Sequence, residues 1–205
     1  MTLFDIPFDS RHNLLPFDGE VFYHGRIVNA DQAWKFYEKL LKEINWEHDK
    51  FVMYGKEITT RRKVGWYGDQ PFPYTYSGVT KKALEWTKVL KELKDLVEKS
   101  SGVTFNSCLL NLYHNGREGM SWHSDDEKDL KRFGTIASLS LGSERKFVFK
   151  HKVDRVKVEL LLEHGSLLVM KGRTQEYWKH RLPPDTAIQS PRINLTFRII
   201  DTSAG

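Results

Sequence analysis

The stretch PRINLTFRII at residues 191–200 alternates polar and apolar side chains from Arg192 onward. Its polar positions are Arg192, Asn194, Thr196 and Arg198, and its apolar positions are Ile193, Leu195, Phe197 and Ile199. Strict alternation predicts a β-strand with one face in a hydrophobic core. A solvated strand face would rarely frame an amide and a hydroxyl with two arginines, so the function of this polar face becomes the central question.

Further short strands are predicted after Gly102, separated by turn signals such as Asn115-Gly116 and His164-Gly165. They are FNSCLLNLYHNG, TIASLSLG, RKFVFKHK, VKVELLLEHG, SLLVMKG and INLTFRII. Apolar residues at helical spacing predict helices from residue 29 to about 48 and from about 80 to 99. This order favours an α+β, mainly β fold: a double-stranded β-helix, or jelly roll, with two supporting helices in the N-terminal half.

Each expected helix has an end signal and an apolar stripe. Asn29 or Asp31 is a candidate N-cap for the first helix, and Gly102 is the stop for the second. We expect the stripes to face the core, with Trp34, Tyr37, Leu41 and Ile44 in the first helix and Leu84, Leu90, Leu93 and Val97 in the second.

Length and composition predict one globular domain over residues 1–205, with 40% hydrophobic and 29% charged residues. Within it we expect a loosely structured arm at 1–20, nucleotide-recognition hairpins at 51–78 and the jelly-roll core at 103–200. No stretch suggests a membrane span or a secretion signal, so we expect no membrane partner. We also expect a monomer.

The single cysteine, Cys108, excludes an intrachain disulfide and a cysteine-based metal site. We therefore expect a reducing intracellular compartment, the cytoplasm of a bacterium or the nucleus of a eukaryote. A net charge of +5 is compatible with a polyanionic partner and equally with a slightly basic protein that has none.

The segment GMSWHSDDE contains candidate metal ligands. His123 and Asp125 are two residues apart, so on a strand both side chains project from one face. Two histidines and one carboxylate with open positions are typical of non-haem Fe(II) oxygenases. His180 in EYWKHRLPP is the preferred second histidine, because it follows a strand and precedes a Pro-Pro turn, while His151 and His164 remain alternatives.

An iron site that activates oxygen needs a two-electron donor, commonly the dicarboxylate 2-oxoglutarate, and guanidinium groups match carboxylates well. Arg192 and Arg198 are roughly 20 Å apart along an extended strand, so we expect them to bracket a short diacid. Asn194 and Thr196 would add hydrogen bonds, and the same-face pair Asn111 and Tyr113 in LLNLYHNG could complete the pocket.

These motifs resemble the AlkB family of Fe(II)/2-oxoglutarate dioxygenases, which repair alkylated nucleic acids, and most closely its human nuclear members. The resemblance rests on HSD at 123–125, His180 followed closely by Pro, NLY at 111–113 and RINLTFR at 192–198, and it covers residues from about 50 to 200. It implies a jelly roll that uses Fe(II), 2-oxoglutarate and O2. The implied metal ligands are His123, Asp125 and His180, and the implied 2-oxoglutarate contacts are Asn111, Tyr113, Arg192, Asn194, Thr196 and Arg198.

The resemblance also implies where a base would bind. FVMYGKEITTRRK carries an apolar tip flanked by cations, and in the resembling enzymes a hairpin here fills the gap left by a flipped base. An aromatic residue at Tyr76 would stack the base against His123, and carboxylates after the HSD triplet would favour a cationic methylated base. The expected substrate contacts are Tyr54, Gly55, Lys56, Arg62, Tyr74, Tyr76, Asp126 and Glu127.

The functional hypothesis is oxidative demethylation of 1-methyladenine and 3-methylcytosine in DNA, with RNA left open, releasing formaldehyde and succinate. The alternatives are a 2-oxoglutarate hydroxylase acting on RNA or on a substrate other than nucleic acid, and a non-catalytic jelly-roll module that binds nucleic acid. The basic run RKFVFKHKVDRVK at 145–157 is expected to form a hairpin that meets phosphates, although a solvated charged ribbon fits its pattern equally well.

Overall fold

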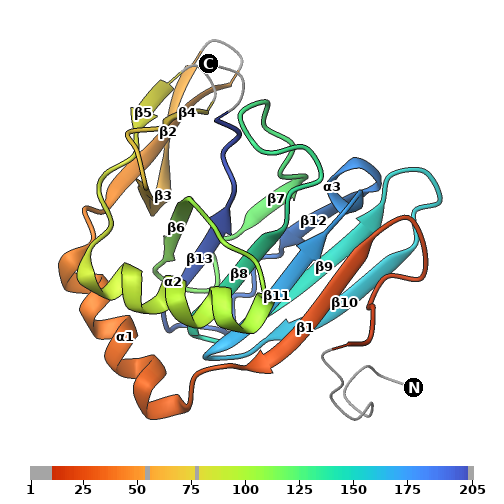
Figure 1. Ribbon diagram of the computed structural model, residues 1–205, viewed down its shortest axis with the longest axis horizontal. Helices are drawn as coiled ribbons and strands as arrows, with labels where there is room; N and C mark the ends of the chain where they lie inside the picture. The colour runs from red at the N-terminus through yellow and green to blue at the C-terminus, as the bar shows by residue number, and fades with distance from the viewer. Residues whose placement is uncertain (1–10, 54–55, 77–78, 203–205) are drawn as a thin grey trace.

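The computed structural model describes residues 11–53, 56–76 and 79–202, and it describes residues 49–53, 56–58, 74–76 and 79–81 by their backbone alone. Two antiparallel sheets dominate it (Figure 1). The large sheet contains, in spatial order, β1 (Glu20–Arg26), β11 (Ser166–Lys171), β8 (Ile136–Gly142), β13 (Arg192–Arg198), β6 (Ser107–Tyr113), β3 (Lys56–Gly68) and β2 (Glu47–Met53). The small sheet contains β10 (Lys157–Leu162), β9 (Arg145–His151), β12 (Trp178–Leu182) and β7 (Met120–His123).

Two hydrophobic clusters lie on opposite faces of the large sheet. One fills the space between this sheet and helices α1 (Ala30–Glu43) and α2 (Lys88–Ser101), which cover its outer side in Figure 1. The other joins the two sheets, with Leu168 and Met170 from the large sheet and Phe149 and Trp178 from the small one. This layered, mainly β arrangement confirms the predicted jelly roll with two supporting helices.

The apolar face of β13 packs in the cluster beneath the helices, through Ile193, Leu195 and Phe197. Because side chains alternate along a strand, the polar face of β13 points to the opposite side, into the space between the sheets. Every residue of β13 is buried. The polar face of the strand is therefore an interior surface.

Both helices are shorter than predicted. The side chain of Asn29 accepts from the backbone N–H of Gln32 and caps α1, and α2 ends at Gly102 with a φ of 70°, as expected. Helix α1 nevertheless stops at Glu43, and residues 47–48, predicted as helix, belong to β2. The helix buries Ala33 and Leu40, which lie one residue before the predicted Trp34 and Leu41.

The prediction of helix from residue 80 is wrong for its first two turns. Val79–Lys82 forms strand β5, which pairs with β4 (Pro73–Tyr76) in a separate hairpin. Leu84 is 44% exposed and bonds through its backbone to Trp66 and Gly68. The helix starts only where the Thr87 side chain accepts from the N–H of Leu90.

Segments outside 103–200 complete the large sheet. Strand β3 is 13 residues long, forms a hairpin with β2 and then pairs with β6 through its second half. The loose arm was predicted over residues 1–20, of which residues 1–10 lie outside the described residues. Residues 11–19 fold back on β1, since Asn13 bridges Phe22 and Leu15 is buried. None of the described helices is long and apolar enough to cross a membrane.

Gly116, in the predicted Asn-Gly turn after β6, packs tightly against the loop that precedes β13. Its N–H donates to the carbonyl of Ile188, and its carbonyl accepts from the N–H of Asp185. A Cβ at this position would lie 1.9 Å from the carbonyl oxygen of Asp185, which is a backbone atom and cannot rotate away.

We therefore expect Gly116→Ala to lower the free energy of unfolding by about 3 kcal/mol or more, within the range of severe packing errors. The control is Gly102→Ala, where the Cβ meets nothing within 4 Å and only the positive φ opposes it. That change should cost roughly 1–2 kcal/mol. Urea unfolding followed by circular dichroism measures both, and equal losses would contradict the expectation.

Candidate active site

The polar face of β13 forms a chain of hydrogen bonds between the sheets. Nη2 of Arg192 donates to Oδ1 of Asn194 at 2.8 Å and to the hydroxyl of Ser140, on β8, at 2.9 Å. Nδ2 of Asn194 donates to the hydroxyl of Thr196 at 2.8 Å. These bonds fix the rotamers along the strand, so the face is a preorganised polar wall.

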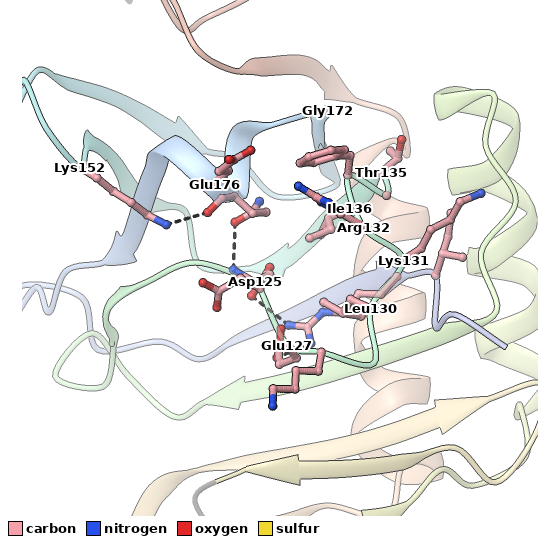
Figure 2. A pocket seen from close by; sticks show the side chains of 17 residues that line it. Asp125, Glu127, Leu130, Lys131, Arg132, Thr135, Ile136, Lys152, Gly172 and Glu176 are labelled. Atoms are coloured by element: carbon pink, nitrogen blue, oxygen red, sulfur yellow. Dashed lines mark hydrogen bonds and ion pairs between the residues drawn. The ribbon is translucent and has the colours of Figure 1, made fainter. Parts of the chain in front are cut away.

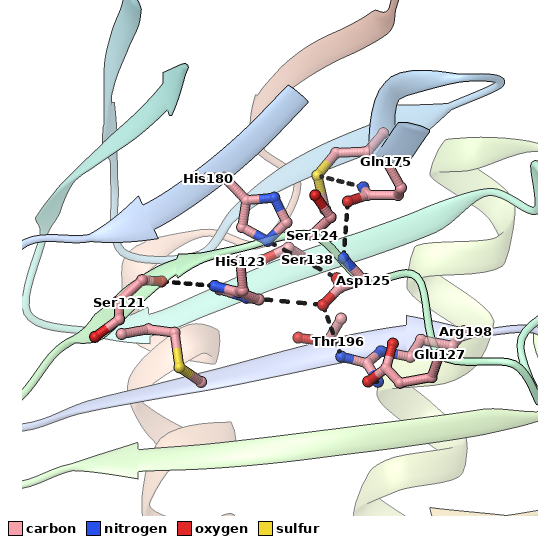
Figure 3. Close-up of polar contacts among 12 residues, drawn as sticks. Ser121, His123, Ser124, Asp125, Glu127, Ser138, Gln175, His180, Thr196 and Arg198 are labelled. Carbon is pink, nitrogen blue, oxygen red and sulfur yellow. Dashed lines mark hydrogen bonds and ion pairs between the residues drawn. The ribbon is translucent and has the colours of Figure 1, made fainter. Parts of the chain in front are cut away.

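A cluster of three possible metal ligands lies opposite this wall. Strands β7 and β12 are neighbours, and His180 stands directly opposite His123 in their register. The two imidazoles therefore project from one face, with ring centroids 4.3 Å apart. Asp125 follows β7, and one ligand atom from each of the three residues lies within 4.8 Å of the others (Figure 3). Two nitrogens and one carboxylate oxygen suit a divalent transition metal.

The structure separates His180 from the two other histidine candidates. His180 lies within β12 and not after a strand. His151 is buried beside Asp154, its Nδ1 2.9 Å from that carboxylate, and His164 accepts from the N–H of Gly142. Neither joins the cluster around Asp125 within the described residues.

The surroundings of the cluster set its charge. Burial would raise the pKa of Asp125, but attraction to Arg198, and then to the two histidines, outweighs burial and lowers it. Nη2 of Arg198 lies 3.1 Å from Oδ1 of Asp125. Burial, followed by the effect of His123, lowers the pKa of His180 to about 3. At neutral pH the cluster therefore presents a carboxylate and a neutral imidazole, which are the metal-binding forms.

Neighbouring groups also orient the ligands. Nδ1 of His123 lies 2.8 Å from the carbonyl of Ser121, which favours a proton on Nδ1 and leaves Nε2 directed at the cluster. The N–H of Asp125 donates to Oε1 of Gln175, in the short helix α3 (Thr174–Tyr177), at 2.9 Å. Both contacts hold a ligand in the orientation that a metal requires.

Arg192 is a buried cation without a buried anion. It is 2% exposed, and its hydrogen-bond partners are the neutral side chains of Ser140 and Asn194. Its Nε has no hydrogen-bond partner among the described residues, and no carboxylate of this part of the chain pairs with it. Burial lowers its pKa to about 10. An unpaired buried charge is costly, so this position is suited to an anionic ligand.

The three possible metal ligands and the buried Arg192 line one cavity. Its volume is about 310 Å³, and Arg192, Asn194, Thr196 and Arg198 line it together with His123, Asp125 and His180. Asn111 and Tyr113, from β6, line it as well, and Oδ1 of Asn111 is buried without a hydrogen-bond partner among the described residues. Arg198 is engaged differently from Arg192, because its guanidinium contacts the carboxylates of Asp125 and Glu127.

The predicted substrate contacts are placed only in part. Arg62 reaches the cavity from β3, where its Nη1 contacts the sulfur of Met120 at 3.4 Å. Asp126 is exposed at the cavity, and Oε1 of Glu127 accepts from Arg198 at 3.0 Å. The other predicted contacts lie outside the described residues, either entirely (Tyr54 and Gly55) or in their side chains (Lys56, Tyr74 and Tyr76).

A second cavity, of about 490 Å³, lies on the other side of Asp125 (Figure 2). The loop after β7 and the start of α3 line it, and the contact between Asp125 and Gln175 forms part of its wall. Nζ of Lys152 donates to the carbonyl of Gln175 at 2.9 Å and secures α3. Gln175 was not predicted, because nothing in QEYWK marks a glutamine whose side chain accepts from the backbone N–H of a residue 50 positions away.

The cluster predicts divalent-metal binding that depends on His180. His180→Asn should weaken the affinity for Fe(II) or Co(II) by more than about 100-fold. Even the loss of a residue that only hydrogen-bonds a metal ligand typically weakens metal affinity 10–100-fold. The matched control is His164→Asn, whose amide oxygen can still accept from Gly142. Isothermal titration calorimetry under anaerobic conditions measures both, and equal affinities would remove His180 from the site.

The burial of His180 also predicts a pH effect on the stability of the metal-free protein. The pKa of His180 is about 3 in the fold and 6.5 for an ordinary imidazole, so between these values the unfolded chain binds the extra proton. Its contribution is fully present above pH 6.5 and is lost as pH falls toward 3. Relative to His180→Asn, the wild type should lose about 1.4 kcal/mol per pH unit there. Denaturant titrations in the presence of a chelator give the free energy of unfolding of both proteins at each pH. If the two free energies fall in parallel with pH, the expectation is contradicted.

Comparisons with known proteins agree with the geometry. Residues 19–198 match the family model described as 2OG-Fe(II) oxygenase superfamily. The chain is 39% identical to alpha-ketoglutarate-dependent dioxygenase alkB homolog 3 of Homo sapiens, over 85% of this chain and 64% of that protein. It is 38% identical to DNA oxidative demethylase ALKBH2 of Homo sapiens, over 84% of this chain and 69% of that protein.

The chain thus spans about 64% of the length of the alkB homolog 3 relative from Homo sapiens. Among solved structures, "The structure of OsALKBH1" covers 87% of this chain and 97% of its own, with a TM-score of 0.62 at 16% identity, a likeness of fold alone. Family model and relatives together show that the chain belongs to the 2OG-Fe(II) oxygenase superfamily and, within it, to the AlkB family.

Proposed function

We propose that this protein is an oxidative demethylase that removes N-methyl groups from nucleobases such as 1-methyladenine and 3-methylcytosine, using Fe(II), 2-oxoglutarate and O2. The observation that carries the proposal is the uncompensated guanidinium of Arg192 in the cavity that also holds the His123, Asp125 and His180 cluster. A metal cluster alone fits many enzymes. A buried cation beside it that lacks a partner anion among the described residues fits a diacid cosubstrate.

The residues present fit both groups. His123, Asp125 and His180 would hold Fe(II), and Arg192 would pair with the distal carboxylate of 2-oxoglutarate, with Asn111, Tyr113, Asn194, Thr196 and Arg198 lining its site. When bound, iron and 2-oxoglutarate would supply the oxidising chemistry: one oxygen atom of O2 would enter 2-oxoglutarate, which would lose CO2 and become succinate, and the other would hydroxylate the N-methyl carbon, whose hydroxymethyl group would leave as formaldehyde.

The chain's own residues supply orientation and charge. Arg198 keeps Asp125 ionised and correctly turned, and the burial of Asp125 and His180 excludes water from the metal side. Asp126 and Glu127 place negative charge at the mouth of the cavity, where Coulomb attraction would favour a cationic methylated base. Arg62, on β3, is positioned to meet the nucleotide from the opposite side.

The substrate and setting extend this proposal. DNA is the proposed substrate, since the ALKBH2 relatives are named DNA oxidative demethylases, and RNA stays the alternative because no described residue is seen to read a 2′-hydroxyl. We further propose that residues 1–205 act as one catalytic domain and as a monomer, in a reducing compartment, with Tyr54, Gly55, Lys56, Tyr74 and Tyr76 at the base.

The test is detection of formaldehyde, and of the matching loss of mass, on oligonucleotides that carry 1-methyladenine or 3-methylcytosine. DNA and RNA, single-stranded and duplex, are compared with Fe(II), 2-oxoglutarate and air present. His123→Ala should abolish both formaldehyde and succinate. Succinate formation without any loss of mass from these oligonucleotides would point to another substrate.

Arg192 gives a prediction for the cosubstrate alone. Arg192→Lys keeps a cation but loses the two-pronged guanidinium, so the KM for 2-oxoglutarate should rise on the order of tenfold. The control is Arg26→Lys, at an exposed ion pair with Glu163. Succinate formation at varied 2-oxoglutarate concentration gives both values. An unchanged KM for the Arg192 variant would contradict the assignment of the diacid to this arginine.

A further inference from the structure

The outer face of the small sheet carries a row of like charges. Phe147 and Phe149 of β9 contact His180, so the alternate residues of β9 point away from the active site. On that outer face Lys150 stands directly opposite Lys157 of β10 on one side and Lys179 of β12 on the other. These three residues are called the lysine row below. At a strand spacing of about 4.8 Å, the row spans about 10 Å.

The row is not neutralised within the described part of the chain. Like charges directly opposite one another destabilise a sheet, and none of the three lysines has an ion pair there. The same hairpin contains a contrasting case, because Lys146 pairs with Glu159 at 3.1 Å. The repulsion among the three lysines is therefore left uncompensated, although two residues further along β10 Glu159 neutralises a lysine.

An aromatic side chain adjoins the row at the active-site edge of the sheet. Trp122 of β7 lies under the guanidinium of Arg181, 4.6 Å from its ring centroid, and under Nζ of Lys150, 5.7 Å away. Trp122 immediately precedes His123, and consecutive strand residues point to opposite faces. The surface with Trp122 and the lysine row thus begins one residue from a candidate metal ligand.

We propose that Trp122, Arg181 and the lysine row bind the phosphodiester backbone of the single-stranded segment next to the base in the active site. This inference rests on the proposed function and deepens it. A single row of cations beside a partly exposed indole matches one sugar-phosphate chain, because proteins bind single strands with a cationic groove that also carries aromatic side chains. The shared chemistry is phosphodiester, which DNA and RNA both supply.

The test variant is Lys150→Gln/Lys157→Gln/Lys179→Gln. Its matched control is Lys35→Gln/Lys42→Gln/Lys91→Gln, which removes the same charge from exposed positions on α1 and α2. Fluorescence anisotropy measures binding of an unmodified single-stranded oligonucleotide of about 15 nucleotides, as DNA and as RNA, over a range of salt concentrations. Vesicles containing phosphatidylserine form a separate arm.

We expect the row variant to bind both oligonucleotides on the order of tenfold more weakly at low salt. The slope of log K against log salt should fall in magnitude by roughly 2, since each of the three phosphate contacts on a single strand contributes about 0.7. Its KM for a methylated oligonucleotide of that length should rise relative to its KM for a methylated trinucleotide. The control should match the wild type in both measurements. Thermal stability of the row variant should be equal or higher, because repulsion is relieved.

Equal salt slopes for the row variant and the control would overturn the inference, as would a loss confined to the vesicle arm. Binding to unmodified oligonucleotides needs no turnover, so this test stands apart from the proposed function. Demethylation by the wild type with unchanged binding in the row variant rejects the row alone. Weakened binding without any demethylation by the wild type rejects the proposed chemistry and keeps the surface.

Discussion

The buried ion pair between Arg198 and Asp125 is the contact on which the candidate site depends. It joins the last strand of the large sheet to the loop that leaves the small one, at 3.1 Å. Both charged groups are buried, and each is neutralised by the other. Removing one partner would leave the other charge buried and unpaired, which typically costs 3–5 kcal/mol. It keeps Asp125 ionised between two imidazoles and fixes the gap between the sheets in which the polar wall of β13 and the cavity lie.

The alternation in β13 was sufficient to predict the strand and its apolar core face, because a period of two is typical of a half-buried strand. The interior position of the polar face was indicated only by its residues, two arginines that frame an amide and a hydroxyl. The ligand set could be predicted from local spacing for His123 and Asp125, whereas His180 needed the resemblance to settle it against His151 and His164. What selects it physically is the register of β12 against β7, a long-range pairing that no local pattern contains. Gln175 was missed for the same reason.

For the helices, apolar periodicity predicted that they exist but not where α2 begins or which face of α1 is buried. Leu84 continues an apolar period into α2, but it lies where the chain bonds to Trp66 and Gly68 as an extended segment. Tertiary hydrogen bonding outweighed periodicity there, and the Thr87 cap marked the true start. Trp34 and Leu41 have the right spacing but sit one position off the buried stripe, since several registers of an amphipathic helix fit the same residues.

Because His123 and His180 are cross-strand partners, their imidazoles meet only when β7 and β12 are paired in this register. Any divalent ion held between them thus binds the folded chain and not the unfolded one. By mass action, an ion at a hundredfold excess over its Kd adds about 2.7 kcal/mol to the folded state. Resistance of the chain to heat and to proteases is then a readout of how well it is supplied with metal.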